Sequence, residues 1–272
     1  MMAPIEIANC SNPGQKRPQN EDSTATNTDL GLAILADGMG GYKAGEVASA
    51  IAVTSIMHHV GTGVSRLQRG QVDPTTGYSR ESELLKNAVA EANQGIFKVA
   101  QQHATCRGMG TTVVVVLMHA DKISIAHVGD SRLYRLRGDS LQQITSDHSL
   151  IQELVSRGLY SEEEAIANTP KNLVTRALGI ESKVDIDILE DEAQAGDIYL
   201  LCSDGLNDMV NDEEIRLTLR KYSANLTQAV YELVRQANNN GGRDNISVVL
   251  VRKCEPNNRN GSITRKLLNL FS

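Results

Sequence analysis

The chain has 272 residues, of which 40% are hydrophobic and 22% charged, so it is long enough to bury a substantial core in one large domain or two small ones. Its net charge of −6 and its 3% of aromatic residues, with no Trp, argue against a protein that binds nucleic-acid backbones or stacks unpaired bases. Its four cysteines include no CxxC pair, so the sequence signals neither a zinc cage nor a disulfide framework.

The chain begins with the sequence MMAPIEIANCSN, which lacks the basic region and the apolar core of a secretory signal peptide. No apolar stretch approaches the length that a membrane span needs, so we expect a cytoplasmic protein without a transmembrane segment. Residues 5–9 alternate weakly between apolar and polar and are predicted to form an edge strand.

The loop at residues 11–22 is rich in Asn, Pro, Gly and Gln, and its charged residues include Arg17, Glu21 and Asp22. Adjacent residues of a strand face opposite sides, but at a strand end or in a bulge both acids can reach one point. The two alternatives here are a solvated charge cluster and one edge of a binding site.

Residues 32–36 form a continuous apolar run, which predicts a strand buried on both faces. Asp37 follows at once, and the sequence Gly-Met-Gly-Gly comes after it, so we expect a carboxylate on a turn that lets the backbone approach a ligand. An Asp-Gly pair is also a common turn signal. A carboxylate at the end of a buried strand is costly unless a cation pairs with it. The alternative interpretation is therefore that Asp37 binds a cation.

Two helices are predicted next, over residues 45–60 and 81–102, because apolar residues recur there at helical spacing. Three strands follow at residues 111–118, 122–128 and 132–136, with short linkers between them. Strands joined this tightly are expected to be antiparallel neighbours, since a parallel pair needs a long crossover. A purely doubly wound architecture is thereby excluded.

Residues 147–179 are polar and predicted to be helical, and they interrupt the strand pattern. Two further strands are predicted at residues 184–189 and 197–202, and two helices at residues 212–221 and 226–238. The last predicted strand is at residues 245–252. No repeat or linker divides the chain, so we predict one α/β domain built on antiparallel sheet and followed by a short tail.

Three further acids, Asp130, Asp204 and Asp244, lie at predicted strand ends, as Asp37 does. The end of one antiparallel strand lies beside the start of its neighbour, so Asp37, Asp204 and Asp244 can share one rim. Clustered carboxylates repel one another unless cations neutralise them, and ligands that offer only oxygen favour Mg²⁺ or Mn²⁺ over zinc. A pair of such ions bridged by Asp37 would suit phosphate hydrolysis, and Arg17 would supply a guanidinium fork for the phosphate.

Six short motifs follow one another along the chain: Arg17-x-x-Asn20-Glu21-Asp22, Asp37-Gly38-Met39-Gly40-Gly41, Gly108-Met109-Gly110-Thr111-Thr112, Val128-Gly129-Asp130-Ser131-Arg132, Ser203-Asp204-Gly205 and Gly242-Arg243-Asp244-Asn245. Each motif is weak alone, but the ordered set is specific. In this order they resemble the metal-dependent (PPM, type 2C) Ser/Thr protein phosphatases, with the features of a bacterial member. The resemblance extends over residues 9–251, nearly the whole chain.

The resemblance implies a fold of the α/β class, α+β type: a four-layer αββα sandwich of two antiparallel β-sheets flanked by helices. The phosphatase catalytic domain would span residues 1–253, with a variable flap at residues 147–183 that is a natural place for substrate selection. Residues 254–272 would form a C-terminal tail with the apolar spacing of a short amphipathic helix. This tail is expected to be a docking helix or a frayed end rather than an anchor to a membrane surface or a partner.

The resemblance also implies the residues of the site. Asp37 would bridge two core ions, Mn²⁺ or Mg²⁺, and Arg17 would bind the phosphate of phosphoserine or phosphothreonine. The core metal ligands all offer oxygen, and they are Glu21, Asp22, Asp37, the carbonyl of Gly38, Asp204 and Asp244. Asp130 together with Asp208 resembles the pair that holds a third, weaker ion in bacterial members.

One position departs from the pattern of the family. Some members carry a histidine in or just after the glycine turn as a candidate general acid, whereas this chain has Met39 and Tyr42. His148 is predicted to have a capping or packing role rather than to replace that histidine. A metal-bound water is therefore expected to protonate the leaving group.

We expect a cytoplasmic, monomeric signalling enzyme that hydrolyses phosphoserine and phosphothreonine in phosphorylated proteins, by attack of a metal-activated water, and opposes a bacterial Ser/Thr kinase. A non-catalytic relative that binds a phosphorylated partner through the flap is the alternative, but it would be favoured by missing acids, and all the expected acids are present. A two-metal nuclease is disfavoured by the acidic net charge.

Overall fold

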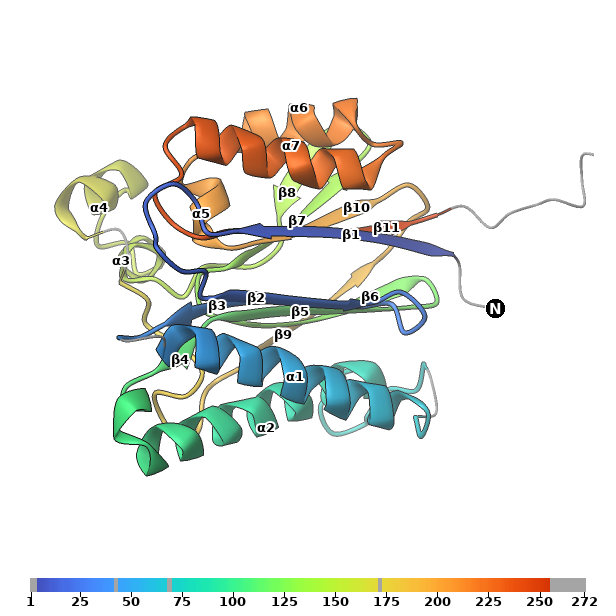
Figure 1. The fold of residues 1–272 in the computed structure, drawn as a ribbon. Helices are drawn as coiled ribbons and strands as arrows, with labels where there is room; N and C mark the ends of the chain where they lie inside the picture. Colours follow the sequence, from blue (N-terminus) through green and yellow to red (C-terminus); the bar gives the residue numbers. More distant parts are fainter. Residues whose placement is uncertain (1–3, 42–43, 68–69, 171–172, 255–272) are drawn as a thin grey trace, which may run out of the picture.

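The structure, a computed structural model, describes residues 4–41, 44–67, 70–170 and 173–254. Two antiparallel sheets pack face to face, and helices cover the outer face of each sheet (Figure 1). The four-layer sandwich predicted from the sequence is therefore confirmed. The predicted tail lies outside the described residues from residue 255 onward.

Both sheets are antiparallel throughout. The five-stranded sheet has the order β1 (Ile5–Asn12), β11 (Ile246–Lys253), β10 (Ile198–Cys202), β7 (Arg132–Arg137) and β8 (Ser140–Gln143). The other sheet has the order β2 (Asp22–Asn27), β3 (Leu32–Met39), β5 (Val113–His119), β6 (Lys122–Val128) and β9 (Asp187–Glu192), and β4 (Gly110–Thr111) pairs with the end of β3.

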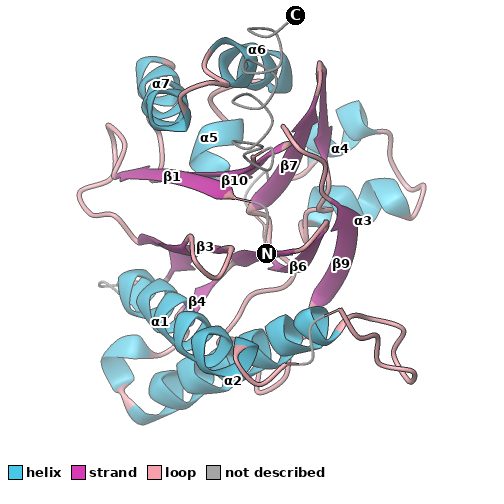
Figure 2. Ribbon diagram, turned by 90° about the vertical axis from the view of Figure 1, so that its right-hand side faces the viewer, coloured by secondary structure: helices cyan, strands magenta, loops and turns pink. Residues whose placement is uncertain are grey.

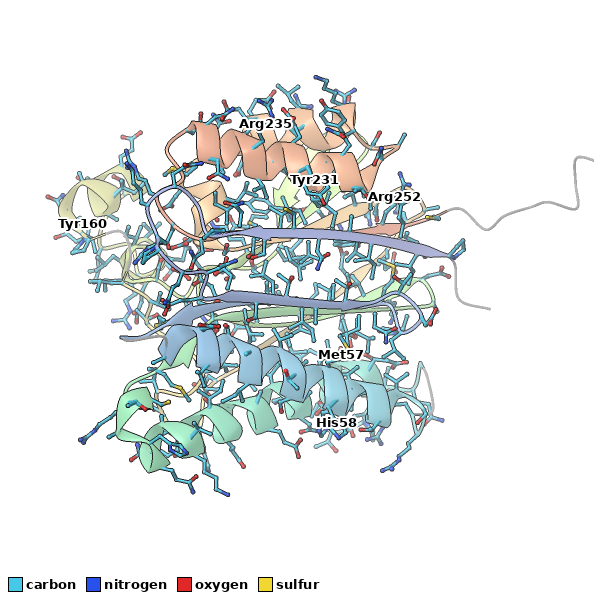
Figure 3. All side chains as sticks on the ribbon, viewed as in Figure 1. Met57, His58, Tyr160, Tyr231, Arg235 and Arg252 are labelled. Carbon is cyan, nitrogen blue, oxygen red and sulfur yellow. The ribbon has the colours of Figure 1, made fainter. Side chains whose placement is uncertain are left out.

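The apolar runs of the sequence reflect the position of these strands between two covered faces. In β5, Val114 and Val116 point into the space between the sheets, whereas Val113 and Val115 face the helices. All four are fully buried. A strand covered on both faces needs no polar alternation, and side chains from both sheets fill the space between them (Figure 3).

Helices form the two outer layers (Figure 2). The six-stranded sheet is covered by α1 (Ala44–Val64) and α2 (Arg80–Gln102), with a short 3₁₀ turn η1 (Ala104–Cys106) after them. The five-stranded sheet is covered by α5 (Asp204–Asn207), α6 (Asp212–Lys221) and α7 (Leu226–Asn239). Two short helices, α3 (Leu150–Ser156) and α4 (Glu162–Asn168), lie beside one end of the sandwich (Figure 1).

Within the described residues, α1 is the one helix that is long and apolar enough to cross a membrane by length and composition. The expectation that no stretch approaches this length is therefore wrong for α1. In the structure α1 packs against the six-stranded sheet and against α2, and its Ala48, Ala52 and Ile56 are fully buried.

The short link between β6 and β7 does not join neighbours of one sheet, as its length had predicted, but carries the chain from one sheet to the other. Gly129 at this crossing has a φ of +111°, which glycine adopts more readily than other residues. The length of a linker limits the distance between two strand ends but does not decide in which layer the second strand lies.

Some predicted boundaries are also wrong. Only α3 and α4 are helical within the described part of residues 147–179, and neither contains many buried residues that would favour a longer helix. The strand predicted at residues 184–189 begins at Asp187 instead. The short elements β8 and α5 were not predicted, because four residues carry too little periodic pattern.

Asp37 lies inside β3 rather than on the turn after it, because β3 continues to Met39 and pairs there with β4. At Gly38 the start of α1 lies close to this strand. A Cβ atom on Gly38 would lie 2.2 Å from the carbonyl oxygen of Gly45 and 2.5 Å from that of Glu21. Both atoms belong to the backbone, so only glycine fits this position.

Gly38→Ala is expected to lower the free energy of unfolding by about 2 kcal/mol or more, because the backbone must shift to admit the methyl group. Urea denaturation measures this change. Gly95→Ala in α2 is the matched control, since the nearest atom to its new Cβ is 3.7 Å away, and a helical Gly→Ala change is expected to be neutral or stabilising by up to about 1 kcal/mol. Equal stability of the two variants would contradict the close approach at Gly38.

Candidate metal-binding active site

Acidic side chains from both sheets meet at one end of the sandwich. Asp37 comes from the six-stranded sheet, Asp204 begins α5 directly after β10, and Asp244 lies two residues before β11. With Glu21 and Asp130 they line one cavity of about 220 Å³. The prediction placed three of these acids on the rim of one sheet, whereas the structure brings them together across the two sheets.

Asp22 lies behind this cavity, where it pairs across the strands with Asp37. It is buried, with a relative exposure of 8%, and its Oδ2 accepts a hydrogen bond of 2.9 Å from the hydroxyl of Ser203. Its other oxygen, Oδ1, has no hydrogen-bond partner within the described structure. Of these two adjacent acids, both predicted as core metal ligands, Glu21 lines the cavity and Asp22 is not part of its lining.

The acids of the site have raised pKa values. Burial, followed by the charges of Asp22 and Asp204, raises the pKa of Asp37 well above its usual range. Burial and the charge of Asp130 do the same for the pKa of Asp204. Burial raises the pKa of Asp22 to about 6. Burial and the charge of Asp147 raise the pKa of Asp130 to about 6.

These observations fit divalent cations. A buried set of carboxylates is costly unless positive charge balances it, and the unpaired Oδ1 of Asp22 is an oxygen donor without a partner among the described residues. The donors that line the cavity are oxygen atoms, which suits Mg²⁺ and Mn²⁺ better than zinc. The individual ligand assignments, including the Gly38 carbonyl, remain predictions.

Two threonines hold the backbone of Asp37 in place. The carbonyl oxygen of Asp37 accepts hydrogen bonds from the Thr111 hydroxyl at 2.8 Å and from the Thr112 N–H at 2.9 Å. The Asp37 N–H donates to the Thr112 hydroxyl, which lies 2.7 Å from the hydroxyl of Ser131. Sequence reasoning assigned no role to these threonines, although both belong to a motif of the resemblance.

Asn245 fixes the loop that carries Arg17 and Glu21. Its side-chain amide donates to the carbonyl oxygens of Pro13 at 3.0 Å and Gln19 at 2.9 Å, and its Oδ1 accepts from the Glu21 N–H at 2.8 Å. The sequence contained one signal for this role, since Asn245 follows directly after Asp244 in the last motif, but its long-range contacts are visible only in the fold.

Arg17 reaches the cavity and forms an ion pair of 2.7 Å with Asp244. About half of its side chain, 52%, is exposed, so the guanidinium is accessible from outside. The hydrogen bond and the charge of Asp244 raise the pKa of Arg17. The residue predicted to bind phosphate therefore contacts a predicted metal ligand in this structure.

The acids predicted to hold a third ion also lie together. Asp130 and Asp208 line an adjoining cavity of about 170 Å³. Asp204 lines both this cavity and the larger one. The structure therefore brings the third pair next to the core acids, while its role in metal binding remains a prediction.

His148 is buried and holds the turn that presents Asp130. Its Nδ1 accepts a hydrogen bond of 3.0 Å from the Gly129 N–H, and its backbone N–H donates to the Gly129 carbonyl oxygen at 2.8 Å. Its Nε2 lies 3.1 Å from the carboxylate of Asp187. The packing role predicted for His148 agrees with these contacts. Met39 lines the cavity, and Tyr42 lies outside the described residues.

Comparison with known proteins gives consistent matches. A family model described as protein phosphatase 2C matches residues 15–250. The serine/threonine phosphatase stp of Listeria innocua is 39% identical over 246 residues, which are 88% of this chain and 92% of that protein.

Solved structures agree with this match. The Mycobacterium tuberculosis serine/threonine phosphatase PstP/Ppp has a TM-score of 0.81 to this chain at 35% identity, covering 92% of this chain and 99% of that one. A structure of the PstP catalytic domain in complex with two manganese ions has a TM-score of 0.79, with the same identity of 35% and the same coverage of 92% and 99%.

The raised pKa values predict how the stability of the metal-free protein depends on pH. The folded state holds protons on Asp22 and Asp130 up to about pH 6, whereas unfolded aspartates release them near about pH 4. The folded state therefore binds more protons in this window, and stability falls as the pH rises through it. In EDTA, thermal melting is expected at a lower temperature at about pH 8 than at about pH 5.5.

Asp37→Asn is expected to raise the melting temperature of the metal-free protein at about pH 8, by about 3 °C or more, because the amide removes one repelling charge. Mn²⁺ should then stabilise the wild type more than the variant. An Asp37→Asn protein that melts below the wild type in EDTA would show that repulsion between the acids does not limit the stability of the metal-free protein.

Proposed function

Since the chain belongs to the protein phosphatase 2C family, we propose that it is a Mn²⁺- or Mg²⁺-dependent protein Ser/Thr phosphatase whose reaction takes place in the acid-lined cavity. The observation that carries this proposal is the meeting of Asp37, Asp204 and Asp244 in one cavity that an exposed arginine, Arg17, also lines. Such a cavity contains oxygen ligands for divalent cations and, beside them, a guanidinium that can donate hydrogen bonds to phosphate oxygens.

In this proposal Asp37 would be shared by two core ions, and Glu21, Asp204 and Asp244 would hold them directly or through waters. The carbonyl of Gly38 offers one more oxygen. When bound, such a pair of ions activates a water and neutralises charge on the transferring phosphoryl group. The structure of the PstP catalytic domain in complex with two manganese ions supports the proposed number and kind of ions.

Arg17 orients the substrate. Its guanidinium can give two parallel hydrogen bonds to a phosphate, which fixes both position and orientation. Because Arg17 contacts Asp244 in this structure, a cation on Asp244 would compete for that carboxylate and leave the guanidinium available for the phosphate. Binding of the ions and binding of the substrate would then support each other.

The leaving alkoxide must receive a proton. Among the described residues that line the cavity there is no histidine, and both ring nitrogens of His148 face other groups, Gly129 and Asp187. The described part of the chain therefore offers no imidazole for this step, and we propose that the proton comes from solvent in the cavity.

Phosphoserine and phosphothreonine proteins are the proposed substrates, and a Ser/Thr kinase is the proposed opposing partner. Cytoplasmic signalling as a monomer completes the proposal. Size-exclusion chromatography measures the oligomeric state, and cell fractionation measures the location.

A non-catalytic binding module is the second candidate, and the exposed flap residues would be its binding surface. The acids that line the cavity together, Glu21, Asp37, Asp130, Asp204 and Asp244, favour the enzyme. Calorimetry that detects no binding of Mn²⁺ would favour the binding module instead.

Hydrolysis of p-nitrophenyl phosphate and of a phosphothreonine peptide is expected with Mn²⁺ and is expected to stop in EDTA. Asp37→Ala should lower kcat by about 10³-fold or more, because the bridge between the ions is lost. A phosphate-release assay measures both rates. Activity that survives both EDTA and Asp37→Ala would rule out the proposed mechanism.

Arg17→Ala is expected to raise KM for the phosphopeptide by about tenfold or more while kcat changes little, because the guanidinium acts mainly in binding the phosphate. Arg17→Lys keeps the positive charge but lacks the guanidinium fork, so its KM should lie between those of the wild type and Arg17→Ala. Steady-state kinetics at saturating Mn²⁺ give both constants. A loss confined to kcat, at an unchanged KM, would argue against the assigned role.

A further inference from the structure

A second cavity, of about 560 Å³, adjoins the acid-lined one. Met39 and Val174 line both cavities, so the two spaces share a wall. The rest of the lining comes from residues 175–185, which comprise the end of the flap and the two residues after it. A chain segment whose phosphoryl group enters the acid-lined cavity therefore passes directly beside this second space.

The wall of this cavity is firmly held. Leu178 exchanges two backbone hydrogen bonds with Thr111, of 3.1 and 2.8 Å. The buried Asn93 of α2 accepts from the Gly179 N–H at 2.7 Å and donates to the carbonyl oxygen of Glu181 at 3.1 Å. Residue 180 lies between these two attachments, so the space is formed before any ligand arrives.

Apolar side chains supply much of the lining. They are Met39, Val174, Ala177, Ile180 and Val184. Ile180 is 49% exposed although its backbone is fixed on both sides. An exposed apolar side chain in a preformed concave wall gains free energy when another apolar group covers it.

Charged groups of both signs line the cavity. Glu181 and Asp185 carry negative charge and Lys183 and Arg176 positive charge. Arg176 is already paired with the carboxylate of Asp187 at 2.8 Å. The remaining Glu181, Asp185 and Lys183 carry a net charge of −1, but all three side chains are exposed and solvent screens them. Contact with an apolar group is therefore the stronger source of discrimination.

We propose that this cavity is a specificity subsite, which receives an apolar side chain located within a few residues of the phosphoserine or phosphothreonine of the protein substrate. The inference rests on the proposed function and adds a substrate class to it. The second cavity, of about 560 Å³, is larger than the acid-lined cavity, of about 220 Å³, so it can hold more than one residue of an extended peptide.

Phosphothreonine peptides with an alanine background test this subsite. A single Leu or Asp is placed in turn at each of the three positions on either side of the phosphothreonine. The wild type is expected to prefer Leu over Asp by about tenfold in kcat/KM at one or more of these positions. Ile180→Asp should abolish the preference, and Ile180→Ala should weaken it, while hydrolysis of p-nitrophenyl phosphate stays unchanged because that substrate has no flanking residues.

Leu217→Asp is the matched control, because Leu217 is equally exposed, at 50%, and lies on α6 over the other sheet. It should leave the peptide preference unchanged. Hydrolysis without any preference in the wild type, or a preference that survives Ile180→Asp, overturns the subsite alone. Absence of Mn²⁺-dependent hydrolysis of p-nitrophenyl phosphate by the wild type overturns the proposed function and the subsite with it.

Discussion

Repulsion between carboxylates in one buried cavity is the constraint on which this structure depends. The charge of Asp204 contributes to the raised pKa of Asp37, and the charge of Asp130 contributes to that of Asp204. A fold that relieved this repulsion by separating the acids would lose the site. The protein instead retains it, and bound divalent cations supply the missing stabilisation. Stability and function are thus connected through the same carboxylates.

Neutral hydrogen bonds from distant parts of the chain keep the acids in place. Thr112 holds the backbone of Asp37, Asn245 holds the loop of Glu21, and His148 holds the turn before Asp130. None of these three side chains needs to change its charge to do so. The acid-lined end of the sandwich is therefore set by contacts between the two sheets, the flap and the N-terminal loop. Such support keeps the positions of the acids precise without adding charge.

Much of the fold could be predicted from the sequence, because period and composition carry the needed signal. The apolar run of β3, the helical spacing of α2 and the β-branched run of β5 each indicated the correct element. The layer of β7 could not be predicted, since a short linker allows either sheet. For the site, strand ends and motif order identified the acids, but the contacts of Asn245 span more than two hundred residues and leave no local pattern.

The central claim is that the acid-lined cavity binds two divalent ions bridged by Asp37. Anomalous difference density from crystals soaked in Mn²⁺ tests it most directly. Two strong peaks are expected in the cavity, on either side of the Asp37 carboxylate, together with an Arg17 side chain that has left Asp244. Strong peaks only elsewhere, for example beside the group of His127, His148 and Asp187, or no peak in the cavity, would contradict this claim.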